Sequence, residues 1–74
     1  MDEGRMTNLA KVIELVGVSK TGWEDASLNA VKEASKTLDN ITGVEVIRYN
    51  GVVKDGKVTD YKAVVKIAFG LTDR

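Results

Sequence analysis

Cysteine, histidine and proline are absent from this 74-residue chain, and its aromatic residues are one tryptophan, two tyrosines and one phenylalanine. Without cysteine the fold has no disulfide, and without cysteine or histidine a structural zinc site lacks its usual ligands. A domain of this size buries only about 60% of the surface that its unfolded chain exposes, so its own core gives marginal stability. We therefore expect oligomerisation to supply the remaining stability.

An excess of either charge is also missing, because eleven basic residues balance eleven acidic ones. Such a chain has no overall basic field to attract nucleic acid or anionic lipid, and no apolar run approaches the roughly 20 residues that span a bilayer. We expect a cytoplasmic protein with no nucleic-acid partner and no membrane partner.

Enzyme motifs are missing as well, since the chain has no nucleophile elbow, no glycine-rich phosphate loop and no zinc-protease helix motif. Catalysis by a lysine or a carboxylate in a desolvated pocket is the alternative, and Lys62 is its candidate residue. We expect no enzymatic activity.

The first half of the chain predicts a strand followed by a helix. Residues 1–6 are polar and are interpreted as a leader or alternative start, with one domain over residues 7–74. The run from Leu9 to Val18 is apolar on both alternating faces, which predicts a strand. A capping-box pattern at residues 21–24 predicts a helix N-terminus. The helix is expected to end near residues 38–40, with an inward stripe made of Trp23, Ser27, Ala30, Val31, Ala34 and Leu38.

The second half predicts a hairpin. β-branched residues from Val44 to Val53 predict a strand, in which Gly51 suggests a bulge or bend. The Asp55-Gly56 pair favours a type I′ turn. A long third strand follows, with its odd-numbered residues from Tyr61 facing the helix. The expected fold class is α+β, with a βαββ order and a three-stranded antiparallel sheet wrapped around one helix.

A single helix covers only one face of such a sheet. Val64 and Ala68 are expected on the other face, where apolar side chains without cover indicate a subunit interface. The alternative is a two-layer monomer with scattered surface valines, because single exposed apolar residues are common.

Several segments together resemble the dodecin family over residues 11–71, namely KVIELVGVS at 11–19, the helix from Trp23, Val44-Glu45-Val46, DGKV at 55–58, Tyr61 and Phe69. The resemblance implies the βαββ fold and a hollow homododecamer. It also implies a storage or binding role, because the best-known dodecins bind flavins such as FMN or riboflavin in pairs at subunit interfaces.

In flavin-binding dodecins a tryptophan on the second strand stacks on the flavin, and a glutamine on the third strand pairs with the polar edge of the ring. Alignment on Glu45 and Tyr61 places these two positions at Gly43 and Lys62. Glycine has no ring, and lysine donates but does not accept. Gly43, Glu45 and Lys62 are thus the candidate residues of a modified flavin pocket. The only tryptophan, Trp23, is expected to pack the helix against the sheet or a neighbour.

This pattern resembles the divergent calcium-dodecin branch, whose members are reported to bind calcium instead of flavin. The sequence has no EF-hand loop, so a calcium site would combine carboxylates from different segments or subunits. The candidates are Glu14, Glu45 and Asp60, each of which can instead be solvated or paired with a lysine. Symmetry can gather one such carboxylate from several copies. A structural shell without a dedicated ligand is the remaining alternative.

Overall fold

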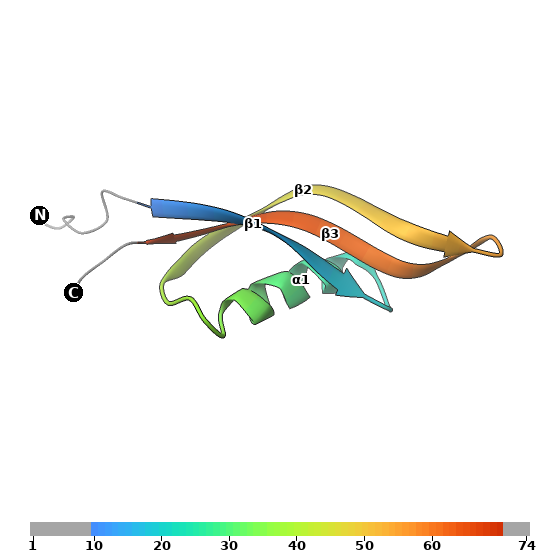
Figure 1. Cartoon of the computed structure of the whole chain (residues 1–74), viewed down its shortest axis with the longest axis horizontal. Coiled ribbons are helices and arrows are strands. Elements are labelled where there is room, and N and C mark those ends of the chain that lie inside the picture. The colour runs from blue at the N-terminus through green and yellow to red at the C-terminus, as the bar shows by residue number, and fades with distance from the viewer. Residues whose placement is uncertain (1–9, 71–74) are drawn as a thin grey trace, which may run out of the picture.

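The computed structural model describes residues 10–70, and the predicted leader at residues 1–6 lies outside them. Strand β1 (Ala10–Ser19) is followed by helix α1 (Trp23–Ala34) and then by strands β2 (Ile41–Lys54) and β3 (Lys57–Gly70) (Figure 1). This order confirms the predicted βαββ fold. Within these residues no helix combines the length and the apolar character that crossing a bilayer requires.

The three strands form one antiparallel sheet in the order β1-β3-β2, so β3 lies in the centre. β1 pairs with β3 without interruption, and its last residue, Ser19, lies opposite Tyr61. β2 pairs with β3 from Lys57 to Phe69. Because β1 stops at Tyr61, the far ends of β2 and β3 continue as a two-stranded ribbon beyond the helix (Figure 1). The turn has φ angles of 52° at Asp55 and 76° at Gly56, as a type I′ turn requires.

Helix α1 lies unusually close to the sheet because both sides of the contact are small. Its buried residues Ala26, Ala30 and Ala34 recur every four positions. They pack against the odd-numbered side of β3, which confirms the predicted inward face: Ala63, Val65 and Ile67. On β1, a Cβ atom added to Gly17 would lie 2.0 Å from the carbonyl oxygen of Ala26. Only glycine leaves room for the helix backbone there.

The predicted capping box is wrong, because Gly22 is the N-cap residue and no side chain caps the helix. The buried hydroxyl of Ser19, at the end of β1, instead holds the turn that leads into the helix. It accepts hydrogen bonds from the backbone N–H groups of Thr21 (2.9 Å) and Gly22 (3.3 Å) and donates to Asp25 (2.7 Å). The turn into the helix is therefore organised from the end of β1.

Three further expectations needed correction. The helix ends at Ala34, and residues 35–38 form turns in which the Leu38 N–H still reaches the Ala34 carbonyl (2.9 Å). The buried face of the helix contains Ala26, which the sequence pattern missed. Ser27, which was predicted on this face, is only half-buried. The irregularity that Gly51 suggested is present but lies just after it, since the register shifts between Val52 and Val53. Glycine is needed at position 51 because an added Cβ would lie 2.8 Å from the Asp60 carbonyl oxygen.

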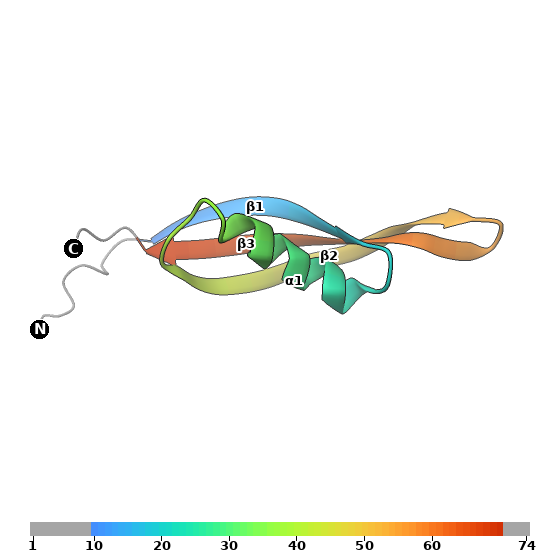
Figure 2. The ribbon, with the colours of Figure 1, turned by 90° about the horizontal axis from the view of Figure 1, so that it is seen from below.

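The helix leaves much of the sheet without cover. It packs on β1 and β3 and barely contacts β2. Seen from below, the helix crosses the strands at an angle (Figure 2). Apolar residues of β2 are therefore exposed even on the helix side, including Val44, Val46 and Tyr49. The opposite face, which we call the open face, has no covering element among residues 10–70, so Val12 and Val16 of β1 are about half exposed.

Candidate ligand site on the open face of the sheet

The open face is ordered into rows by the strand register. Each row combines one residue of β1, one of β3 and one of β2 that lie side by side. In chain direction along β1 the rows are Val12, Ala68 and Gly43; Glu14, Lys66 and Glu45; Val16, Val64 and Arg48; Val18, Lys62 and Asn50. Every predicted site residue except Asp60 lies in one of these rows, and Asp60 follows on β3 opposite Val52.

The first two rows border a groove with a volume of about 510 Å³. It is lined by Val12, Gly43, Val44, Glu45, Lys66 and Ala68. The nearest atom to a Cβ built on Gly43 is the Ala68 Cβ, 4.0 Å away, so the glycine leaves open space above the sheet. Gly43 and Glu45 are thus neighbours on β2 and line the same groove.

No aromatic ring lies on this face of the described residues. Trp23 instead anchors the start of α1 on the helix side, where its Nε1 donates to the Asn50 carbonyl (2.8 Å). Its ring meets that of Tyr61 edge-on with centroids 4.8 Å apart, and the ring of Tyr49 lies 6.2 Å away. Phe69 pairs across the sheet with Ile41, which packs against the core on that same side. The predicted packing role of Trp23 is confirmed.

Lys62 is on the open face but far from Gly43. Gly43 lies opposite Ala68, which is six residues further along β3 than Lys62. At about 3.3 Å per residue, this separates the two positions by about 20 Å. A single chain therefore does not bring Gly43 and Lys62 to one ligand, and a pocket containing both takes them from different copies.

The three carboxylate candidates do not lie together in one chain. Glu14 and Glu45 lie on either side of Lys66 in one row. Asp60 is bound by the Lys20 ammonium at 2.6 Å, and this hydrogen bond holds the pKa of the Asp60 carboxyl below its ordinary value. Within residues 10–70 no three acidic side chains are grouped as metal ligands would be. A calcium site would need carboxylates from more than one copy.

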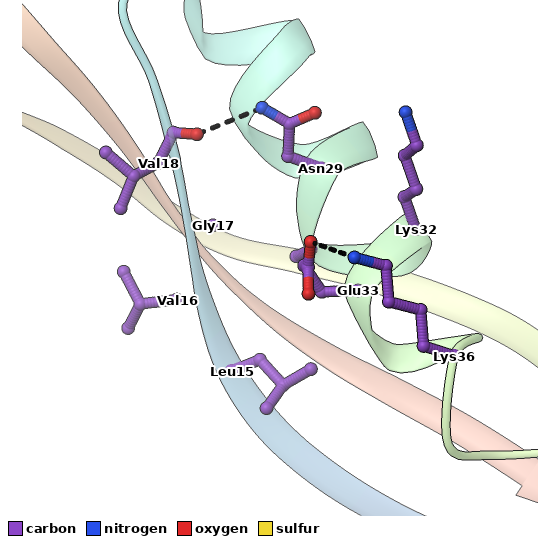
Figure 3. Close-up of a pocket in the computed structure, with 9 residues that line it drawn as sticks. Leu15, Val16, Gly17, Val18, Asn29, Lys32, Glu33 and Lys36 are labelled. Atoms are coloured by element: carbon purple, nitrogen blue, oxygen red, sulfur yellow. Dashed lines mark hydrogen bonds and ion pairs between the residues drawn. The ribbon is translucent and has the colours of Figure 1, made fainter.

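A second hollow, of about 580 Å³, lies between the edge strand β1 and helix α1 (Figure 3). Leu15 and Val16 border it from the strand, Lys32 and Glu33 border it from the helix, and Lys36 borders it from the turn that follows. The Asn29 amide donates to the Val18 carbonyl (3.0 Å) and closes one end of the hollow. Lys36 pairs with Glu33 (3.0 Å). β1 is an edge strand, so among the described residues no strand pairs with its outer edge beside this hollow.

Arg48 is the open-face residue that sequence reasoning missed. It lies opposite Val64, one row from Lys62 and Asn50. A register shift between Val46 and Arg48 turns it to this face, and strict alternation along β2 gives no sign of that shift.

Comparisons with known proteins agree with this architecture. The Dodecin family model matches residues 9–72. The chain is 34% identical to the dodecin of Thermus thermophilus over 68 residues, which covers 92% of this chain and 99% of the relative. It is 37% identical over 60 residues to the calcium dodecin of Mycobacterium tuberculosis, with 80% and 83% covered.

Solved structures agree as well. The dodecin of Streptomyces coelicolor superposes with a TM-score of 0.86 at 36% identity, covering 93% of this chain and all of that one. The Thermus thermophilus protein tt0972 gives a TM-score of 0.84 at 33% identity, covering 89% and 97%. This chain therefore belongs to the dodecin family.

Proposed function

We propose that the chain is the subunit of a homo-oligomeric, non-catalytic protein of the dodecin type, a homododecamer that binds or stores a small ligand. The observation that carries the proposal is the imbalance between buried and exposed apolar side chains. The largest fully buried ones in the described residues are Ile67 and Val65. Between residues 10 and 70, ten large hydrophobic residues are exposed, among them Leu28 at 60% and Val53 at 63%.

Those on the strands lie on both faces of the sheet, such as Val12 and Val16 on the open face and Val44 on the helix side, so no single additional helix would cover them. Burying a whole valine or leucine side chain contributes about 1.5 to 3 kcal/mol, and covering the exposed half contributes about 1 kcal/mol each. Several such residues per copy supply a driving force comparable to the stability of a small domain. The two edge strands and the two-stranded ribbon offer further surfaces to neighbouring copies.

Light scattering after size-exclusion chromatography tests the assembly. We expect a particle of about twelve times the 8.0 kDa mass of one chain. Val46→Lys, on the uncovered part of β2, should reduce the particle mass, whereas Asp39→Lys adds the same residue to an exposed loop position and should not. A well-folded 8.0 kDa wild-type species at micromolar concentration would refute the proposal.

For the ligand, we propose a flavin (FMN or riboflavin) in a modified pocket shared between copies, with Gly43 and Glu45 from one copy and Lys62 from another. Three observations support this: the groove beside Gly43, the open space above this glycine, and the distance of about 20 Å that separates Lys62 from it within one chain. Quenching of flavin fluorescence on titration measures the binding. A protein that leaves both flavins fluorescent refutes the flavin ligand.

Calcium is the second candidate, supported by the carboxylates of Glu14 and Glu45 in one row and by the similarity to a protein named calcium dodecin. Asp60 is the third carboxylate that neighbouring copies can contribute. A ligand that binds only the native assembly raises its thermal stability. A rise in melting temperature with calcium and not with magnesium supports this candidate, and Glu45→Gln should abolish the rise. No shift with calcium or either flavin would indicate a shell without a dedicated ligand.

A further inference from the structure

The two-stranded ribbon, residues 52–60, leaves the body of the subunit where β1 ends. Its first pair, Val52 with Asp60, follows directly after the last pair that β1 makes. Figure 1 shows the ribbon extending past helix α1. Among residues 10–70, the hydrogen bonds of its Thr59 hydroxyl go to Val52 and Asp60 and so stay inside the ribbon. A two-stranded hairpin alone is marginally stable, so the direction of the ribbon depends on contacts at its root.

Two residues beside the turn between β1 and α1 hold this root. On one side of the turn, the Lys20 ammonium contacts the Asp60 carboxylate of β3 at 2.6 Å. On the other side, Trp23 Nε1 donates to the carbonyl of Asn50 on β2 (2.8 Å), and its ring meets that of Tyr61 edge-on at 4.8 Å. We call these contacts of Lys20 and Trp23 the clasp. The clasp holds both strands of the ribbon, one through each residue.

Gly51, the last residue before the ribbon on β2, gives the indole of Trp23 its place. A Cβ atom added to Gly51 would lie 3.8 Å from Trp23 Cζ2 and 2.8 Å from the Asp60 carbonyl oxygen. The indole therefore lies next to the backbone at the point where the ribbon begins. A tilt of the ribbon at this point moves the Asn50 carbonyl relative to Trp23 Nε1 and breaks a hydrogen bond that depends on direction.

A small tilt at the root becomes a large displacement at the tip. Lys57, where β3 begins, is four residues before Tyr61, which is about 13 Å at about 3.3 Å per residue. A swing of about 10° therefore moves the tip by about 2 Å. Interface backbones of preorganised complexes shift by less than about 1 Å on binding. Contacts that a second copy makes with exposed ribbon residues such as Val53 are lost after such a swing.

We propose that Lys20 and Trp23 are positioning residues for assembly, because they fix the direction in which the ribbon meets a second copy of the chain. This inference rests on the proposed homo-oligomer and adds the residues that prepare a subunit for it. Neither residue belongs to the buried core, so a subunit with an open clasp keeps its helix and sheet. Its ribbon then has the required direction for only part of the time, and the apparent dissociation constant rises as that fraction falls.

The experiment is light scattering after size-exclusion chromatography of the full-length protein over a range of concentrations, with circular dichroism on the same samples. Trp23→Phe keeps a ring and loses the hydrogen bond to Asn50, and should raise the concentration at which the assembly is half dissociated about 10-fold. Lys20→Gln should raise it about 2- to 5-fold, because the Lys20 pair is exposed. Both variants should retain the helical signal. Lys20→Arg keeps the charge and should assemble like the wild type.

Two control variants separate the clasp from a general loss of stability. Ile67→Val weakens the fold about as much as Trp23→Phe, but it does so in the buried core, six residues along β3 from Tyr61. Lys36→Gln matches Lys20→Gln, because it removes an exposed pair, with Glu33 at 3.0 Å, that does not involve the ribbon. Neither control should change the concentration of half dissociation by more than about 2-fold.

The outcomes separate the clasp from the proposed assembly. An assembled wild type whose clasp variants dissociate no more readily than the two controls overturns the clasp and leaves the assembly intact. A wild type that runs as a single folded chain removes the assembly, and the clasp with it. If Trp23→Phe loses the helical signal, Lys20→Gln and Lys20→Arg decide the question, because the Lys20 side chain is 78% exposed and its loss leaves the core unchanged. Equal dissociation of these two variants would then overturn the clasp.

Discussion

Replacing Gly17 by alanine should be among the most damaging single-methyl changes in this fold. The added Cβ would lie 2.0 Å from the Ala26 carbonyl oxygen and 2.9 Å from the Ala30 Cβ. Ordinary contact begins near 3.4 Å, and the obstacle is helix backbone, which has no alternative rotamer. The helix must therefore retreat by more than an ångström from β1.

The loss of stability comes from the helix–sheet contacts that this movement breaks. Ala26 and Ala30 reach the sheet only because the helix lies so close, and both are almost completely buried. Overpacking of a core costs about 1 to 3 kcal/mol, and a backbone obstacle places Gly17→Ala at the upper end, about 3 kcal/mol. A chain of this size has about 4 to 11 kcal/mol of total stability, so the variant loses a large share of it.

Urea denaturation at one fixed protein concentration, followed by circular dichroism, measures the loss, because the stability of an oligomer depends on concentration. Two other strand glycines give a graded comparison. Gly51→Ala, with an added Cβ 2.8 Å from the Asp60 carbonyl oxygen, should cost about 1 to 2 kcal/mol. Gly43→Ala meets only an atom at 4.0 Å and should gain about 0.4 to 1 kcal/mol by restricting the unfolded chain. If Gly17→Ala and Gly43→Ala unfold within about 0.5 kcal/mol of each other, the close approach of helix and strand is refuted.

Three further changes test other contacts. Ser19→Ala removes the acceptor of two backbone N–H groups and a donor to Asp25, and should lower the free energy of unfolding in urea by about 1 to 3 kcal/mol. Thr21→Val should lower it less. Equal losses in the two variants would favour the capping box instead. Trp23→Phe loses the hydrogen bond to the Asn50 carbonyl and should cost about 1 kcal/mol by circular dichroism, and an unchanged midpoint would contradict that role. Asp60 has a pKa below its ordinary value of 3.8, so its charged form stabilises the fold. The wild type should therefore be more stable to urea than Asp60→Asn above about pH 5, and this difference in stability should shrink as the pH falls below 3.8. A difference that grows on acidification would be inconsistent with the Lys20 pair.

The fold was accessible from the sequence because its local signals agree with one another. The alternation along β3, the Asp55-Gly56 turn and the two-sided apolar pattern of β1 each predicted one element, and the structure confirms all three. The helix ends were less accessible. The turn before the helix is held by the hydroxyl of Ser19, which belongs to the preceding strand and accepts from the Thr21 N–H. A capping-box pattern includes only residues at the helix end, so it does not identify Ser19.

The candidate site was accessible only in part. Gly43, Glu45 and Lys62 were identified through family resemblance, and the structure places all of them on the open face. The distance between these residues was not accessible, because the pairing register between strands decides it. Gly43 and Lys62 lie on the neighbouring strands β2 and β3, but they are about 20 Å apart along the strand direction. A binding pocket made of such positions belongs to an assembly, and a single sequence contains no direct record of the contacts between copies.

The register shift at Ile47 decides which side chains in the middle of β2 lie on the open face. Val44 and Val46 face the helix side, opposite Ile67 and Val65, and strict alternation would turn Arg48 the same way. The extra residue at position 47 reverses the alternation, so Arg48 faces the open side while Tyr49 returns to the helix side beside Trp23. One inserted residue thus satisfies two opposing requirements, because it keeps an aromatic contact for the start of the helix and places a guanidinium next to Lys62. Without it, Arg48 would lie on the side of the core and Tyr49 would lie in the middle of the open face, where it would offer a ring to a ligand instead of a charge.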